Sequence, residues 1–412
     1  MAAATSAAHH APFVAALRVL AEDPAATLDE LAALHPVLPY VSRRLGPVGA
    51  DVARRLVDLF DELAADDPDT HRPDLAWALN EWAVRLGEIG LHSKALAAIE
   101  RAVELLRALA QDDPDAHLSL LAGVLTNYAN RLSYRGRGAD ALAAADEAAA
   151  HYRALSETDP GAYRVERARV QSNIAVLLDE LGRDEEALAA AEQAVTLRRA
   201  LTRDDRAAHE TDLAASLTIF ATLLGHAGRH EEALALSAEA LAHYRLRAEA
   251  SPDAYLSMLA SSLNLHSICL AAAGRLDEAL AAVLESVALR RALADSSRDT
   301  DLPDLAASLN TLSLRLARLG RDAEALAAIE EAFGHFRALV DVAPASYLPE
   351  LVTVASNRAE QLVRLGRHSE ALAGFDEVVA LARALVQQDP AVFGRVLAAA
   401  LRRADRLRHR PA

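Results

Sequence analysis

The hydrophobic pattern of this chain repeats along most of its length. One leucine series has a constant spacing of 46 residues: Leu86, Leu132, Leu178, Leu224, Leu270, Leu316 and Leu362. A second series has the same spacing, and each of its members follows an alanine: Leu96, Leu142, Leu188, Leu234, Leu280, Leu326 and Leu372. A fixed period of this size, with no insertion or deletion, predicts a solenoid of repeated units rather than a few globular domains.

A glycine lies between the two leucines of each repeat and marks a turn. The series runs Gly90, Gly136, Gly182, Gly228, Gly274, Gly320 and Gly366. Glycine supplies a turn residue with positive φ at no steric cost. In six of the copies an arginine follows the glycine, and an acidic residue stands three positions after that arginine. We expect a local arginine–acid pair in the first turn of the next helix, and we favour it over an anion site.

The residues around this turn predict two helices in each repeat. In the earliest copy the first helix is expected from about Pro73 to Ile89 and the second from about Ser93 to Ala110, each of about 17 residues. Prolines at one phase of the period are expected to separate consecutive repeats: Pro68, Pro114, Pro160, Pro252, Pro344 and Pro390. Large and small residues on facing helices favour close antiparallel packing.

Three segments follow from this pattern. Residues 1–49 lack the period and are expected to form an irregular helical N-terminal cap, with helices near 12–21 and 28–34; a small independent module is the alternative. Residues 50–390 are expected to form the solenoid, with about seven full helix pairs after a leading second helix. Residues 391–412 carry a first helix without a second, and we expect an arginine-rich capping helix there.

The repeated positions resemble those of tetratricopeptide repeats. The small residues at Ala83, Gly90, Ala95 and Ala102 match that family's pattern, as do the larger Leu79, Leu86 and Ile99. The period exceeds the usual length of about 34 residues, and it is most similar to the long repeats of kinesin light chains and of actinobacterial repeat proteins. The resemblance implies an all-α, right-handed superhelical solenoid of antiparallel helix pairs whose first helices line a concave groove.

One polar column falls on those first helices. Its members are all Asn, Ser or Thr, although these residues are mediocre helix formers: Asn80, Thr126, Ser172, Thr218, Asn264, Asn310 and Ser356. Neighbouring positions add Asn127, Asn130, Asn173 and Asn357. These side chains either bond neighbouring helices and set the repeat spacing, or form a ladder for a peptide backbone, since one amide offers both donor and acceptor. The two roles are compatible.

Variable positions on the same face are expected to determine specificity. Trp77 is the best single anchor, although it could equally pack under the N-terminal cap. The expected rim of the groove begins with Glu88 and Tyr134 and ends with Arg318 and Arg364, so its charge changes sign and could orient a charged ligand. The family's carboxylate clamp needs lysine on the first helices, and none is present there, so a chaperone tail is not expected.

Composition limits the partners and the compartment. The 412 residues carry a net charge of −16, which argues against general affinity for nucleic acid or for anionic membranes. The one cysteine, Cys269, has no partner for a disulfide, which favours a reducing compartment. Neither a signal peptide nor an apolar run of about 18 residues is recognisable. We therefore expect a cytoplasmic protein.

No catalytic pattern is recognisable, and neither a cofactor nor a metal is expected. The histidines that begin several first helices have no cysteines or i,i+4 partners to complete a zinc site. The leading hypothesis is a non-enzymatic scaffold that binds a peptide or partner segment in its concave groove. The alternative is a ligand-sensing regulatory subunit that acts on a separate effector. A third hypothesis is homo-oligomer formation through the last helix or the N-terminal cap.

Overall fold

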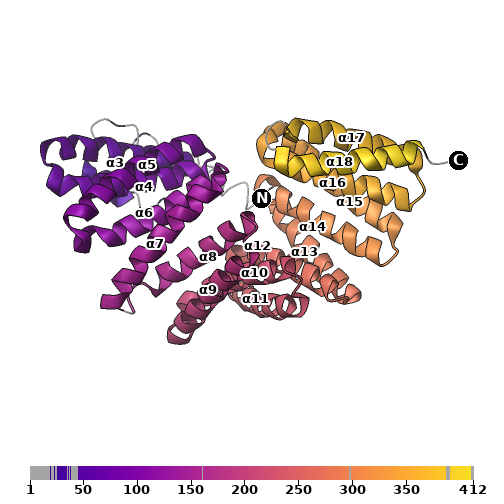
Figure 1. The fold of residues 1–412 in the computed structure, drawn as a ribbon, viewed down its shortest axis with the longest axis horizontal. Coiled ribbons are helices and arrows are strands. Elements are labelled where there is room, and N and C mark those ends of the chain that lie inside the picture. The colour runs from indigo at the N-terminus through magenta and orange to yellow at the C-terminus, as the bar shows by residue number, and fades with distance from the viewer. Residues whose placement is uncertain are drawn as a thin grey trace, which may run out of the picture. The chain divides into compact units, whose positions relative to one another are not determined.

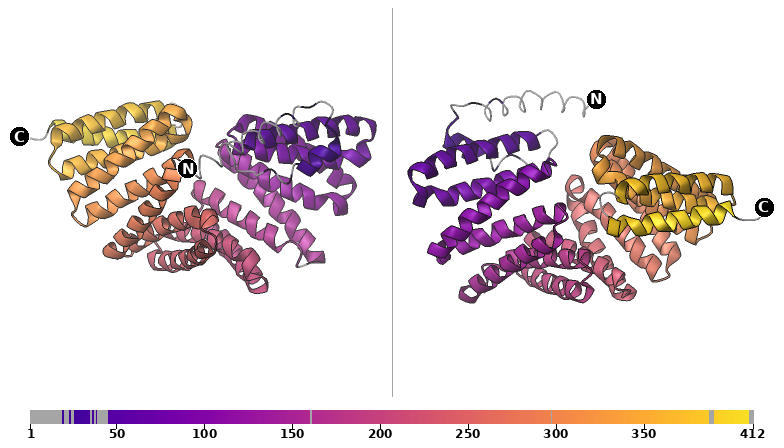
Figure 2. Two further views of the ribbon diagram at one scale, coloured as in Figure 1. Left: turned by 180° about the vertical axis from the view of Figure 1, so that it is seen from behind. Right: turned by 45° about the horizontal axis from the view of Figure 1, so that its top comes forward.

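The structure is a computed structural model. It describes residues 19, 23, 26–34, 36, 38, 45–159, 161–296, 298–386 and 390–409. Apart from Val19, the helix expected over residues 12–21 lies outside the described residues. Within the described ranges the regular elements are all α-helices, and consecutive helices run antiparallel (Figure 1; Figure 2). The all-α prediction is confirmed.

The chain divides into two compact units, residues 1–209 and 210–412, which we describe separately. Helix α10 (Arg206–His226) contains the boundary. The first unit holds α2 (Leu28–Leu34), α3 (Gly46–Asp66), α4 (Pro68–Glu88), α5 (His92–Asp112), α6 (Pro114–Tyr134), α7 (Gly138–Thr158), α8 (Arg164–Glu180) and α9 (Asp184–Asp204).

The second unit continues from Glu210 in α10 with the same alternation. It holds α11 (His230–Ala250), α12 (Pro252–Ala272), α13 (Leu276–Ser296), α14 (Arg298–Arg318), α15 (Asp322–Val342), α16 (Pro344–Arg364), α17 (His368–Val386) and α18 (Pro390–Arg408). The even-numbered helices from α4 are the first helices of the repeats, and the odd-numbered ones from α5 are the second helices.

The helices are longer than the sequence suggested. Helices α4 and α5 have 21 residues each rather than about 17, so a three-residue turn and the single residue Asp113 complete the 46-residue period. The expected start at Pro73 is wrong, because Pro68 opens α4 and Pro73 lies inside it. Proline is tolerated in a first turn, where its missing N–H would be unpaired in any case. Pro47 likewise lies in the first turn of α3.

At several junctions between repeats, a single aspartate separates the two helices and caps the next one. Asp67 ends α3, and its side chain accepts a hydrogen bond from the Thr70 N–H of α4. Asp113 accepts one from Ala116 N–H in the same way. Such a cap satisfies an N–H that has no partner inside the helix. One residue is therefore sufficient to reverse the chain.

Seven glycines form the turn between the two helices of each repeat, as predicted. Their φ angles lie between 70° and 81°, in the left-handed region. After Gly182, the backbone N–H of Arg183 donates to the carbonyl of Leu178, a member of the first leucine series, at 2.8 Å. This bond satisfies a carbonyl at the C-terminus of α8. The Arg183 side chain then pairs with Glu186 at 2.6 Å. The predicted arginine–acid pair forms in all six copies.

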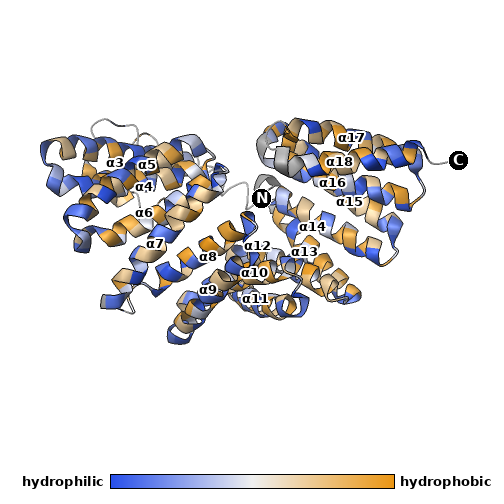
Figure 3. Ribbon diagram, in the orientation of Figure 1, coloured by the Kyte–Doolittle hydropathy of each residue, from blue (hydrophilic) through white to orange (hydrophobic). Residues whose placement is uncertain are grey.

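Alanine and leucine fill the space between helices. The seven leucines of the first series are all buried, and the alanines equivalent to Ala95 are at most 1% exposed. Figure 3 shows the resulting apolar stripes along the helices, interrupted by hydrophilic positions. Because the alanine positions have no free volume beside them, their size sets how closely the helices approach.

First helices of neighbouring repeats lie closer to one another than second helices do. First helices contact one another directly, α4 with α6, α6 with α8, α12 with α14, and α14 with α16. Second helices are bridged by long side chains instead, in the ion pairs Arg107–Glu147, Arg245–Glu285, Arg291–Glu331 and Arg337–Glu377. Each unit therefore curves toward its first helices. We call their free sides the inner face.

Helix α12 meets the length and composition of a membrane-spanning helix, and among the described residues it is the one that does. The sequence prediction had recognised no such run. Helix α12 is in register with the other first helices and contacts α11, α13 and α14. This packing is that of a core helix in the stack, which passes the same test because its Leu and Ala residues face other helices.

Two glycines near α15 should respond oppositely to alanine. Gly320 has a φ of 74°, and a Cβ there would meet no atom within 4 Å, so Gly320→Ala costs only backbone strain, about 1 kcal/mol. Gly334 lies exposed inside the helix, where alanine is the better helix former by about 0.5–1 kcal/mol. Urea unfolding should show a lower midpoint for the first variant and a higher one for the second. Shifts of equal sign would contradict the turn assignment.

The arginine–acid turns should make stability fall in acid. Hydrogen bonds from Arg275 hold the pKa of Glu278 below its ordinary value. The pair therefore stabilises the fold fully above the ordinary glutamate pKa of about 4.3, and this contribution is lost as the pH falls through the lowered pKa. Glu278→Gln should lower the unfolding midpoint at pH 7, with the difference from wild type vanishing near pH 3. Asp277→Asn is the control, because Asp277 forms no ion pair with Arg275; an equal pH-dependent loss in both variants would refute the assignment.

Candidate functional site

The asparagines of the inner face join consecutive first helices. Asn127 Nδ2 donates to Asn80 Oδ1 at 2.9 Å, and Asn357 Nδ2 donates to Asn310 Oδ1 at 2.8 Å, in each case across 47 residues. Asn173 Nδ2 donates to Asn130 Oδ1 at 3.0 Å. These bonds correspond to the spacing role that the sequence suggested. The ligand role of the same amides stays a prediction.

The hydroxyl members of the polar column bond within their own helices. Thr126, Thr218 and Ser356 each donate to the carbonyl four residues earlier, at 2.8 to 2.9 Å. Thr126 is only 1% exposed, so its hydroxyl is remote from any groove ligand. Asn264 is half-buried, and its Oδ1 accepts no hydrogen bond from the described residues. Ser172 is half-buried and interacts with another residue of the protein.

A polar pocket of about 570 Å³ opens on the inner face of the first unit. We call it the Tyr134 pocket. Its lining comes from α4, α6 and α8 and comprises Glu88, Asn130, Arg131, Ser133, Tyr134, Asn173, Val176, Leu177 and Glu180. Tyr134 is 68% exposed, and its ring stacks on His92 with centroids 5.3 Å apart. The pocket thus unites the Asn130–Asn173 amide pair with three members of the predicted rim, Glu88, Tyr134 and Glu180.

A second pocket, of about 430 Å³, lies on the same three helices. We call it the Gly123 pocket. It is lined by Asn80, Ala116, Ser119, Leu120, Gly123, Val124, Asn127 and Arg169. A Cβ at Gly123 would lie 3.4 Å from the Tyr152 hydroxyl, an ordinary van der Waals contact. Gly123 and Arg169 belong to the variable column that begins at Trp77, whereas the half-buried Trp77 lines neither pocket.

Two large aliphatic side chains are exposed on the inner face of the second unit. Ile268 and Leu314, one period apart, are 43% and 38% exposed on α12 and α14. The basic rim is tied to the protein itself, since Arg318 donates to the Ala271 carbonyl and Arg364 to the Ala317 carbonyl, both at 2.7 Å. The rim residues in the sequence do change from acidic to basic along the chain. The guanidinium groups of Arg318 and Arg364, however, also bond the neighbouring first helix.

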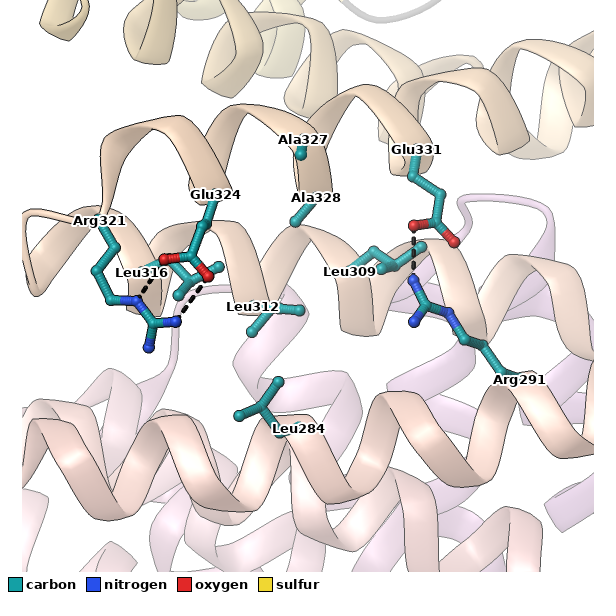
Figure 4. Close-up of a pocket in the computed structure, with 10 residues that line it drawn as sticks. All are labelled: Leu284, Arg291, Leu309, Leu312, Leu316, Arg321, Glu324, Ala327, Ala328 and Glu331. Carbon is teal, nitrogen blue, oxygen red and sulfur yellow. Dashed lines mark hydrogen bonds and ion pairs between the residues drawn. The ribbon is translucent and has the colours of Figure 1, made fainter.

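A different pocket, of about 290 Å³, lies between α13, α14 and α15 (Figure 4). Leu309, Leu312 and Leu316 of α14 lie beneath it, and Leu284 of α13 is 48% exposed at its edge. Two ion pairs close its ends, Arg291–Glu331 at 2.7 Å and Arg321–Glu324 at 2.6 Å. Leu284 stands in a column that is otherwise mostly acidic: Glu100, Asp146, Glu192, Glu330 and Asp376.

Neither the cysteine nor the one close serine–histidine pair among the described residues is an accessible nucleophile. Cys269 is buried, and burial raises the pKa of its thiol, the reverse of what activates a nucleophile. Ser237 Oγ lies 2.9 Å from His266 Nδ1, but Ser237 is 1% exposed and already bonds the Leu234 carbonyl. No group of three His, Cys, Asp or Glu residues in the described ranges could hold a metal ion.

Sequence reasoning missed two features of these pockets. Arg131 shares its column with Arg85, Arg315 and Gln361 as well as with Leu177, Leu223 and Cys269, so its residue type alone did not single it out. Leu284, in contrast, was visible as an apolar residue in a mostly acidic column. It departs from the residue type of the other repeats, so a search for residues that recur in every repeat passes over it.

Comparisons with known proteins support the fold. A tetratricopeptide repeat family model matches residues 167–205. No curated protein matches the sequence. Among solved structures, the apo form of RapI is 14% identical with a TM-score of 0.56, covering 76% of this chain and 99% of its own. The apo quorum sensor NprR from B. thuringiensis is 15% identical with a TM-score of 0.55, covering 82% and 83%. BtubC (BKLC) from P. vanneervenii is 22% identical with a TM-score of 0.48, covering 60% and 92%.

The Asn130–Asn173 bond should be measurable as an energetic coupling. Changing either residue to alanine removes the bond, and the double variant should be more stable than the sum of the single effects implies. The expected coupling is about 0.5–1.5 kcal/mol, the net value of one hydrogen bond. Urea unfolding of the four proteins gives this coupling directly. The pair Asn130 and Asn310, which are not in contact, supplies the additive control, and zero coupling for Asn130 and Asn173 would rule out the spacing role.

Proposed function

We propose that this chain, a tetratricopeptide repeat protein, is a non-enzymatic scaffold that binds an extended segment of a partner protein on its inner face. The observation that carries the proposal is the pair of polar pockets along α4, α6 and α8, of about 570 and 430 Å³. Both are lined by amides and by variable positions that the sequence had assigned to the groove. Tetratricopeptide repeats support many functions, so these pockets, and not the fold, are the basis of the proposed function.

The extent of the two pockets suits a peptide better than a compact metabolite. Ser119 of the Gly123 pocket and Tyr134 of the Tyr134 pocket lie on the same helix, α6. At 1.5 Å per residue, the helix advances about 22 Å between them. An extended segment of about six or seven residues covers that distance at 3.3 Å per residue. Side chains pointing to one face of such a segment could enter both pockets.

The amide pairs retain hydrogen-bonding capacity for a ligand. Asn127 uses one N–H to bond Asn80, and Asn173 uses one to bond Asn130. A side-chain amide has two N–H donors and an oxygen with two lone pairs. The second N–H and the oxygen of Asn127 and of Asn173 can therefore serve a peptide N–H and carbonyl. Their mutual bonds hold the amides in place, which reduces the entropy lost on binding.

The alternative is a ligand-sensing regulatory subunit that acts on a separate effector. The likeness in fold to a protein named as a quorum sensor favours keeping this alternative. Self-assembly through the last helix has weaker support, since Arg403 of α18 pairs with Glu360, and Arg408 with Asp376 and Asp405. A cytoplasmic location remains our proposal, consistent with the single unpaired Cys269.

Site-specific photo-crosslinking separates the inner face from the rest of the surface. Benzoylphenylalanine would replace one of two residues in separate variants. Val176 is 39% exposed in the Tyr134 pocket, and Leu284 is 48% exposed on α13, one of the second helices. After irradiation in the source cells, mass spectrometry identifies the cross-linked partner and its segment. We expect one partner segment to be captured reproducibly from position 176 and not from position 284. Capture of the same segment from position 284 alone would place the site outside the inner face.

A further inference from the structure

Arg131 differs from the other polar residues in its column. Its counterparts at equivalent positions all have hydrogen-bond acceptors: Arg85 donates to the Leu38 carbonyl, Arg315 Nε to Ser267 Oγ, and Gln361 to the backbone carbonyl and side chain of Asp322. Arg131 is 8% exposed, and it forms no hydrogen bond or ion pair with any residue that the structure describes. Its Nε is buried without an acceptor.

The position of the guanidinium is defined by a glycine of the preceding repeat. Arg131 lies against Gly87 of α4, where a Cβ would come within 1.5 Å of Nη1. Arg131 also contacts the Tyr134 ring, with 5.3 Å between the guanidinium carbon and the ring centroid. Gly87 and Arg131 both lie in the last turns of their helices, α4 and α6. Helix C-termini favour a cation there, so the group is tolerated without an acid.

This arrangement leaves a fixed cation that lines a pocket of about 570 Å³. A buried guanidinium has lost most of its hydrogen bonds to water, and an anion that accepts hydrogen bonds from its N–H groups replaces them. The planar fork of arginine matches a carboxylate in a two-point contact. The pocket also contains the exposed Glu88 and Glu180, the latter accepting a bond from Ser133 Oγ at 3.1 Å. These two carboxylates repel a ligand of high negative charge and attract a cation next to its carboxylate.

We propose that the Tyr134 pocket takes an aspartate or glutamate side chain of a mixed-charge peptide segment, with Arg131 binding the carboxylate and Glu88 and Glu180 receiving a neighbouring lysine or arginine. The inference deepens the proposed function and depends on it. It concerns an internal acidic side chain bound by one arginine, which is distinct from the lysine-based clamp that the sequence lacks. The pocket then selects a peptide by the order of its acidic and basic side chains rather than by its net charge.

Peptide pools of defined composition test the proposal without knowledge of the partner. The probes are octapeptides with randomised flanks and a central Asp-Lys, Asn-Lys, Asp-Asp or phosphoserine-Lys pair, incubated with the immobilised full-length chain. Mass spectrometry measures the retained fraction of each pool. We expect Asp-Lys to be retained about tenfold or more over Asn-Lys, a ratio typical of one hydrogen bond to a charged group. Asp-Asp and phosphoserine-Lys should be retained less than Asp-Lys.

Four variants assign any preference to Arg131. Arg131→Met should abolish the preference for Asp-Lys over Asn-Lys, and Arg131→Lys should retain part of it. Gly87→Ala keeps the charge but displaces the guanidinium, so it should also weaken the preference. Arg135→Met, at an exposed arginine outside the pocket, is the matched control and should behave as wild type. Equal unfolding midpoints of Arg131→Met and Arg131→Lys exclude a folding defect as the cause.

The possible outcomes separate this inference from the proposed function. An acidic preference that persists in Arg131→Met overturns the assignment of Arg131. Equal retention of Asp-Lys and Asn-Lys by the wild type overturns the inference and leaves a peptide-binding inner face intact. Higher retention of the phosphoserine pool replaces the carboxylate ligand with a phosphorylated one. Retention of no pool by the wild type contradicts the proposed function, and this inference with it.

Discussion

Contact between a leucine and an alanine on successive helices is the interaction on which the structure depends. The alanines equivalent to Ala95 are at most 1% exposed, so the helices meet at a separation that a larger side chain would not allow. This separation recurs only if each repeat has the same length. The three-residue glycine turns are constant, and the helices and junctions between them together keep each repeat at 46 residues. An insertion in a turn or a junction would rotate the leucine of the next helix away from its alanine.

Constant register also creates the inner face. Because equivalent positions on successive first helices face the same way, residues 47 apart come into contact, as Asn80 does with Asn127. The regular part of the face is therefore held together by its own amides. The pockets are lined by positions that vary between repeats, among them Gly123, Arg131 and Tyr134. The residues that recur in every repeat form the packed framework of the inner face, and the residues that vary between repeats determine the chemistry of each pocket.

The sequence predicted the repeat, the helix pairing, the glycine turns and the arginine–acid pairs, because each depends on residues near one another in the chain. It placed the helix starts wrongly, since proline was interpreted as a terminator and Pro68 opens α4. It also could not find the Arg131 site. That site requires the guanidinium to lie over Gly87 of the preceding repeat, a relation set by the offset between packed helices and invisible in the columns.

The central claim is that a partner segment lies along the first helices of the first unit. Hydrogen–deuterium exchange of the full chain, with and without a saturating peptide from the most strongly retained pool, tests it directly. The account predicts slower exchange in α4, α6 and α8 near residues 119–134 and 173–180, with α5, α7 and α9 unchanged. Protection confined to α5, α7 and α9 would contradict it.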